Sequence, residues 1–228
     1  MRMRASQAGS WEQLSAATLF VRAATVVLLA LATTSCGGLF GDKERTPVAV
    51  YVLSVDRAGE APQAGGCGLL EVSMPDPAPG LGTARMLYQR EAHRLEAFAY
   101  ARWAEPPAQM VQEAIVEALE SSGMFAGVLA APAAVPPELS LDSDGFSIIQ
   151  HFDGGASQSE LSISVRLVDR HASKLLAVKR LSASVPAEGD PEGGVHAANR
   201  ALAGIVEQLL EVTRGALECT NAAAATQH

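Results

Sequence analysis

Cys36 is the residue for which the surrounding sequence predicts the most specific chemistry. Arg22 precedes about ten uncharged, mostly apolar residues, and small residues stand immediately before the cysteine. A helix that spans a bilayer needs about 20 apolar residues, so this run is too short to be one. Its basic start and small-residue end are typical of a secretory signal. In bacteria, a cysteine at this place is acylated when the signal is cut. We therefore predict a signal peptide at 1–35, lipidation of Cys36 and a tether at 36–47.

One position departs from the usual acylation motif. Thr33 stands three residues before the cysteine, where Leu, Val or Ile is usual. The alternative is an ordinary secretory signal that is cleaved nearby, and Cys36 is then lost or stays a free thiol.

Two cysteines, an even number, remain once Cys36 is assigned to the lipid anchor. Cys67 and Cys219 flank nearly the whole mature chain, and an oxidising compartment outside the cytoplasm permits a disulfide between them. In the chain-entropy model such a loop would add roughly 4–5 kcal/mol of stability. Two free thiols are the alternative that the sequence leaves open.

Polar residues that could support catalysis or bind a metal are scattered along the chain. The sequence has no nucleophile elbow, no zinc-protease helix, no phosphate-loop lysine and no Cys-x-x-Cys pair. Five groups come nearest to a site, but each reads better as turn, hairpin-end or helix-capping residues. These groups are His151 with Asp153, His171 with Asp169, Asp142 with Asp144, the PGLGTA turn at 79–84, and Glu188 with Asp190 and Glu192. We predict no catalytic residue, no cofactor and no metal, and hence a protein that is not an enzyme.

The charge of the mature chain excludes one class of partner. Removing residues 1–35 leaves 14 basic and 24 acidic residues, a formal charge near −10. Nucleic-acid binding needs a basic face that releases counterions from phosphates, so a nucleic-acid partner is excluded. The same balance argues against binding to anionic lipid by charge alone.

Hydrophobic periodicity predicts an α+β fold. Two amphipathic helices are expected, one opened by Pro106-Pro107 and closed by Gly123, the other at 191–217. The expected strands are 48–55, 69–73, 85–89, 94–103, 125–129, 139–152, 159–168 and 175–185. This order favours a two-layer domain at 48–218, with a mainly antiparallel sheet and both helices packed on one face, followed by a frayed tail at 219–228.

Aromatic residues gather in one part of this domain. Tyr88, Phe98, Tyr100 and Trp103 fall within sixteen residues, although aromatics make up only 5% of the chain. Strand alternation predicts that Phe98 and Tyr100 share a face opposite Ala97 and its alanine neighbours. These rings either pack the helix against the sheet or line a groove or interface.

Four segments follow Cys36 in order: YVLSVDR at 51–57, LLEVSMP at 69–75, ARMLYQR at 84–90 and LEAFAYARWAEPP at 95–107, with a helix after the last. Together they resemble a known family, the PqiC-like ABC-transport auxiliary lipoproteins. The residues that match the family's motifs are Arg85, Tyr88, Tyr100, Trp103, Glu105 and Pro107. The resemblance covers roughly 48–215. Departures are Val52 in place of a tyrosine, the Gly/Ala loop at 58–68 and the alanine-rich stretch at 126–137.

The resemblance implies a partner role without catalysis. Such proteins accompany a permease, an ATPase and an MCE-domain protein, and serve transport of phospholipids or other apolar molecules between inner and outer membranes. By this resemblance Arg85, Tyr88, Tyr100 and Trp103 are the candidate partner or lipid contacts. Gly37 follows the cysteine in place of the aspartate that retains lipoproteins at the inner membrane, which favours the outer membrane, facing the periplasm. A periplasmic lipid-binding module and a structural lipoprotein of outer-membrane assembly are the alternatives, and self-association is left open.

Overall fold

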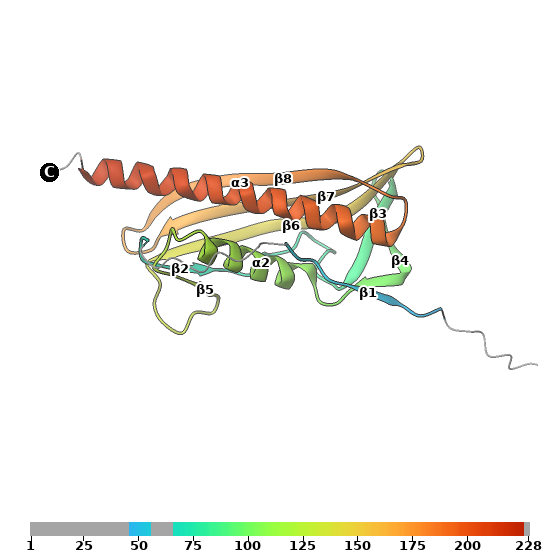
Figure 1. Ribbon diagram of the computed structural model, residues 1–228, viewed down its shortest axis with the longest axis horizontal. Helices are drawn as coiled ribbons and strands as arrows, with labels where there is room; N and C mark the ends of the chain where they lie inside the picture. Colours follow the sequence, from blue (N-terminus) through green and yellow to red (C-terminus); the bar gives the residue numbers. More distant parts are fainter. Residues whose placement is uncertain (1–45, 56–65, 226–228) are drawn as a thin grey trace, which may run out of the picture. The chain divides into compact units, whose positions relative to one another are not determined.

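The computed structural model describes residues 46–55 and 66–225, with side chains as far as residue 217. The chain divides into two units, Met1–Thr46 and Pro47–His228, and the fold described here is that of the second. Its eight strands belong to one sheet, which two helices accompany (Figure 1). The elements are β1 (Ala49–Tyr51), β2 (Leu69–Val72), β3 (Arg85–Glu91), β4 (Arg94–Trp103), α2 (Pro107–Ser121), β5 (Gly127–Ala130), β6 (Leu139–Asp153), β7 (Ala156–Asp169), β8 (Lys174–Ala187) and α3 (Pro191–Ala225).

Three long antiparallel strands, β6, β7 and β8, form the larger part of the sheet. Strand β7 turns an apolar face inward and a mainly polar face outward, as its alternation predicts. The inward residues are Leu161, Ile163, Val165 and Leu167, all buried. On the outward face, the Ser162 and Ser147 hydroxyls lie 2.9 Å apart, and Arg180 donates to Ser162.

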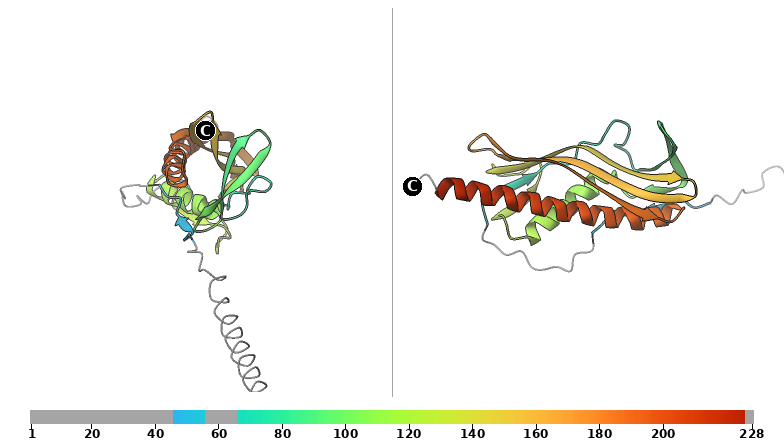
Figure 2. Two further views of the ribbon diagram at one scale, coloured as in Figure 1. Left: turned by 90° about the vertical axis from the view of Figure 1, so that its right-hand side faces the viewer. Right: turned by 90° about the horizontal axis from the view of Figure 1, so that it is seen from above.

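Strand β6 is long enough to hold two separate groups of strands on its other edge. Near its start, Leu70 of β2 pairs with Leu139, and β5 continues the sheet beyond β2. Near its end, Tyr88 of β3 pairs with Gln150, and β4 and β1 follow. The resulting sheet curls around the helices, as the end-on view in Figure 2 shows. The α+β prediction is confirmed, and the parallel pairings β1–β4, β2–β5, β2–β6 and β3–β6 are the feature that periodicity did not reveal.

Helix α3 lies along β7 and β8 and provides much of the core. Asp190 caps its first turn, because the Asp190 Oδ1 accepts a hydrogen bond of 2.7 Å from the Gly193 N–H. The helix buries a continuous stripe of small and branched side chains against the strands. This stripe consists of Val195, Ala197, Ala198, Ala201, Leu202, Ile205, Val206 and Leu209. The backbone stays helical to Ala225, beyond the predicted end at Leu217.

Helix α2 packs mainly against β5 and α3. Pro107 occupies its first turn, where the missing N–H has no intrahelical partner. Gly123 has a φ of 65°, the left-handed conformation that the prediction of a C-terminal glycine requires. None of the helices in the described part of the chain is long and apolar enough to cross a membrane.

Hydrogen bonds from the Gln150 side-chain amide connect strand β6 to the turn before α3. Its Nε2 donates to Ser157 Oγ at 2.8 Å and to the Glu188 carbonyl at 3.0 Å, so strand β6 holds the turn that leads into α3. The Gln150 Oε1 lies against Gly194, where a Cβ atom would approach it to 2.2 Å. Among the described residues this oxygen has no hydrogen-bond partner, and the absence of a side chain at Gly194 is what leaves room for it.

We expect Gly194→Ala to lower the free energy of unfolding by about 1–3 kcal/mol, because the new methyl group overlaps the buried amide. Gly215→Ala is the matched control on the same helix, where nothing lies within 4 Å of the added Cβ. It should raise stability by up to about 1 kcal/mol through helix propensity alone. Urea unfolding of both variants measures the two changes in the free energy of unfolding. An equal change in the two variants would show that Gln150 does not restrict position 194.

Candidate partner-binding surfaces

An irregularity in β4 distributes the aromatic residues over different parts of the sheet. Two steps along β3, from Arg85 to Leu87, correspond to five steps along β4, from Arg102 back to Ala97. The three extra residues are an odd number, so they invert the side-chain alternation of β4. Phe98 therefore lies on the same face as the buried Ala101, opposite to the exposed Tyr100. The prediction that Phe98 and Tyr100 share a face was wrong, because it assumed an uninterrupted strand.

Phe98 belongs to a cluster of three aromatic rings and one arginine, which we call the aromatic–arginine cluster. The Tyr88 and Phe98 ring centroids are 4.6 Å apart, and Phe152 at the end of β6 lies 5.7 Å from Tyr88. The Arg90 guanidinium carbon lies 5.1 Å from the Tyr88 ring centroid and 5.3 Å from that of Phe152. The three rings are half-buried and Arg90 is exposed, so solvent or a partner can reach the cluster.

A polar network holds Tyr88 in place. Its hydroxyl donates to the Glu96 carboxylate at 3.0 Å, across the β3–β4 pair. Arg94 lies 3.6 Å from the same carboxylate and 3.5 Å from that of Glu91. The hydrogen bond to Glu96 is the main cause that raises the pKa of Tyr88 above its ordinary value, with burial and the charge of Glu96 adding to it.

The other candidate contacts lie elsewhere. Arg85 and Tyr100 are exposed, and Arg85 pairs with Arg102 across the two strands. Trp103 is buried in the core beside Tyr51 of β1, so a partner could touch it only after the fold opened. The structure thus brings Tyr88 together with Phe98 and Phe152, and separates it from Tyr100 and Trp103. Phe152 was missed from the sequence, because only the β3–β6 pairing reveals that it lies next to Tyr88.

Three of the polar residues that could have suggested catalysis have partners within the fold. Asp144 pairs with Arg166, His151 lies 3.5 Å from Glu160, and the Asp169 carboxylate accepts the Ala172 N–H within a hairpin turn. No group of three or more His, Cys, Asp or Glu side chains that could hold a metal occurs in 46–55 or 66–217.

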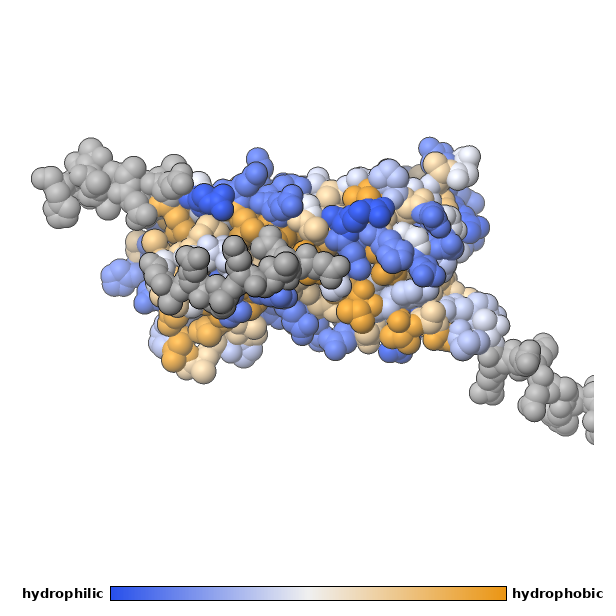
Figure 3. Space-filling model, viewed as in Figure 1, coloured by the Kyte–Doolittle hydropathy of each residue, from blue (hydrophilic) through white to orange (hydrophobic). Residues whose placement is uncertain are grey.

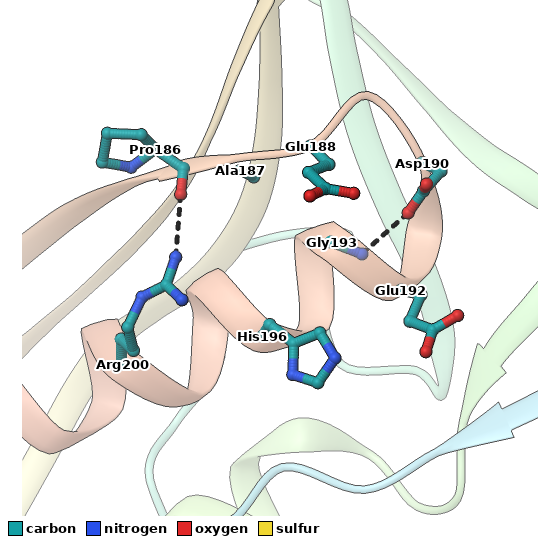
Figure 4. Close-up of a pocket in the computed structure, with 8 residues that line it drawn as sticks. All are labelled: Pro186, Ala187, Glu188, Asp190, Glu192, Gly193, His196 and Arg200. Atoms are coloured by element: carbon teal, nitrogen blue, oxygen red, sulfur yellow. Dashed lines mark hydrogen bonds between the residues drawn. The ribbon is translucent and has the colours of Figure 1, made fainter.

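A cavity of about 760 Å³ lies where β8 turns into α3 (Figure 4). Several of its polar side chains already have partners in the fold. Asp190 caps the helix, and Arg200 donates to the Pro186 carbonyl at 3.0 Å. The remaining ionisable residues on its wall are Glu188, Glu192 and His196. Figure 4 shows that the Glu188 and His196 side chains are not hydrogen-bonded to the residues drawn around them.

A second cavity, of about 310 Å³, lies near Cys67. Leu139, Leu176 and Leu217 give it an apolar wall, and Cys67 itself is exposed. Cys219 follows Leu217 by two residues on α3, in the part of the helix whose side chains are not described. A disulfide between Cys67 and Cys219 therefore stays a prediction. Cys36 and residues 56–65 lie outside the described residues.

The described part of the chain is thus an α+β domain whose buried polar side chains serve the fold and whose most distinctive surface is aromatic. The sequence profile of one family, described as ABC-type transport auxiliary lipoprotein component, matches residues 51–209. The chain belongs to this family. The matched residues include nearly the whole sheet and α3 as far as Leu209.

Solved structures agree with this fold. A crystal structure of a Xanthomonas campestris protein of the DUF330 family superimposes with a TM-score of 0.66 at 18% identity, over 76% of this chain and 99% of that one. A second crystal structure, of an uncharacterized protein, gives a TM-score of 0.53 at 15% identity, over 72% and 96%. At these identities the likeness concerns the fold alone. No curated protein sequence matches the chain.

We expect Glu96→Gln to move one tyrosine titration step to lower pH, because the charged acceptor of the Tyr88 hydroxyl is lost. The contribution of Tyr88 to stability is complete below its unfolded pKa of about 10 and is lost as the pH rises through the raised folded pKa. Ultraviolet absorbance of tyrosinate follows the titration, and Tyr88→Phe is the control that removes the step altogether. Identical curves for Glu96→Gln and wild type would contradict the role of Glu96.

Proposed function

We propose that the protein is a non-enzymatic docking subunit of an MCE-type ABC transport system that moves phospholipid or other apolar molecules between the inner and outer membranes. Lipidated Cys36 holds it at the outer membrane, facing the periplasm. The match to the auxiliary lipoprotein family over residues 51–209 is the observation that carries this proposal. Two of the candidate polar residues support it as well, because Asp190 caps α3 and Asp144 pairs with Arg166.

The aromatic–arginine cluster is the part of the domain best suited to bind the protein partner. Aromatic residues and arginine supply most hot spots of protein interfaces, since they bury a large area and still offer polar groups. Here Tyr88 and Phe152 flank the exposed Arg90, and Glu96 fixes the Tyr88 ring. A preorganised surface of this kind binds with little loss of side-chain entropy. The partner in this proposal is the MCE-domain protein, and through it the permease and the ATPase.

The test is affinity purification of the full-length tagged protein from detergent-solubilised envelopes, with identification of the proteins that elute with it. The wild type should bring down an MCE-domain protein together with a permease and an ATPase. Tyr88→Ala should reduce the recovered MCE-domain protein at least tenfold, a loss of about 1.4 kcal/mol or more of binding free energy. Leu175→Ala is the matched control, because Leu175 is exposed on β8, away from the cluster.

Two results would contradict this function. Recovery of an outer-membrane β-barrel without any transporter subunit would favour the structural-lipoprotein alternative. Undiminished recovery of the MCE-domain protein by a correctly folded Tyr88→Ala variant would show that the cluster is not the docking surface. Circular dichroism of each purified variant establishes that the fold is retained.

A further inference from the structure

Strand β1 and the residues beside it expose an unusual number of apolar side chains. Val48, Val50 and Val52 are 50%, 56% and 57% exposed, whereas Leu53 is only 3% exposed and Tyr51 is half-buried. Strand alternation accounts for this contrast, because Tyr51 points to the core beside Trp103 and the valines point away from it. Figure 3 shows hydrophobic residues at the surface over β1. Contiguous apolar surface with polar residues around it is a mark of an interaction site.

The register of the sheet extends this surface onto two neighbouring strands. Val50 pairs with Arg102 of β4, and Arg102 pairs with Arg85 of β3, so these three side chains lie in one row on one face. Tyr100, two residues before Arg102 on the same face, is 58% exposed. We call the surface of Val48, Val50, Val52, Tyr100, Arg85 and Arg102 the β1 face.

The two arginines of the β1 face have no carboxylate to neutralise them. Neither Arg85 nor Arg102 forms an ion pair with any acidic side chain in the described ranges 46–55 and 66–217. Like charges directly opposite each other in a sheet are destabilising. The Arg102 Nε donates to the Trp103 carbonyl at 3.3 Å, so its other guanidinium N–H groups and those of Arg85 remain available to an anion, in a domain with an excess of acidic residues.

We propose that the β1 face rests on the anionic phospholipid headgroups of the membrane that holds the lipid anchor. This inference rests on the proposed function, which places the anchor at Cys36. Residues 37–47 separate that cysteine from Val48, and a chain of this length spans at most about 40 Å. The β1 face is therefore the surface of the domain at which the anchoring chain enters, and the membrane cannot lie farther from it than this span.

The residue types of the β1 face suit a bilayer interface. Tyrosine places its ring among the lipid headgroups with its hydroxyl in water, and arginine binds phosphate oxygens with two parallel hydrogen bonds. The valines add apolar area that enters the headgroup region. Charge alone would not hold this acidic domain at a membrane, but the anchor raises the local lipid concentration and the two arginines then select anionic headgroups.

A protein that adds a strand to the free edge of β1 would be the rival occupant. Strand β1 has only three residues, Ala49–Tyr51, and so offers few backbone groups for such pairing. The long edge of β8 is partly closed as well, because Arg200 and Gln208 of α3 donate to the carbonyls of Pro186 and Ser182.

The test places a fluorescent probe on the β1 face. Full-length lipidated Val50→Trp protein is reconstituted into vesicles of phosphatidylethanolamine and phosphatidylglycerol with brominated acyl chains. Val178→Trp is the matched control, since Val178 is 59% exposed on β8. Trp103 is the native tryptophan of the mature chain, and its emission is subtracted with the wild type. We expect the Val50→Trp emission to shift to the blue and to be quenched at least twofold more than that of Val178→Trp. Val48→Trp is the second probe if Val50→Trp does not fold.

The result also depends on the lipid and on the arginines. Replacing phosphatidylglycerol with phosphatidylcholine, or introducing Arg85→Glu with Arg102→Glu, should reduce the extra quenching to the level of the control. Equal quenching of the Val50→Trp and Val178→Trp proteins, in vesicles that still carry the protein on flotation, would overturn the inference and leave the anchor intact.

A blue shift that appears without vesicles and grows with protein concentration would overturn the inference in favour of contact between two copies of the chain. Wild-type protein that does not float with vesicles would contradict the anchor itself, and with it both proposals.

Discussion

The burial of α3 against β7 and β8 is the interaction on which the rest of the structure depends. The inward residues of β7 and the alanine-rich stripe of α3 are buried almost completely, so the two elements form one continuous core. Gln150 fixes the start of α3 to β6, and Gly194 lets the helix approach closely enough for that contact. This packing uses the inner face of β6, β7 and β8, and the two surfaces proposed to bind other molecules lie on β3, β4 and β1 and at the end of β6.

These surfaces have different chemistry because β4 is irregular. Three extra residues invert its alternation, so Phe98 joins Tyr88 in the aromatic–arginine cluster, while Tyr100 lies on the opposite face, which it shares with Arg102 and Val50. Strand β4 thereby contributes residues both to the aromatic–arginine cluster and to the β1 face. The proposed docking function requires such a division, because the protein would bind a membrane and a partner protein at the same time. The two proposals assign one surface to each.

Local patterns in the sequence predicted much of the fold. The alternation of β7, the stripe of α3 and the glycine after α2 are all present where periodicity and cap chemistry placed them. The parallel pairings and the irregularity of β4 could not be predicted, because they depend on contacts between residues far apart in the chain. For the same reason Phe152 was missed, and Trp103 was named as a candidate partner or lipid contact although it lies in the core.

We propose that an anchored domain, and not a diffusing one, connects the membrane to the transporter. The most direct measurement compares the wild type with a Cys36→Ser protein exported by a signal that is cleaved without acylation. The folded domain described here does not include Cys36, so both proteins should unfold at the same temperature and bind the MCE-domain protein equally in solution. In cells, the account predicts that Cys36→Ser abolishes transport of labelled phospholipid between the membranes. Transport at the wild-type rate by the unacylated protein would contradict it.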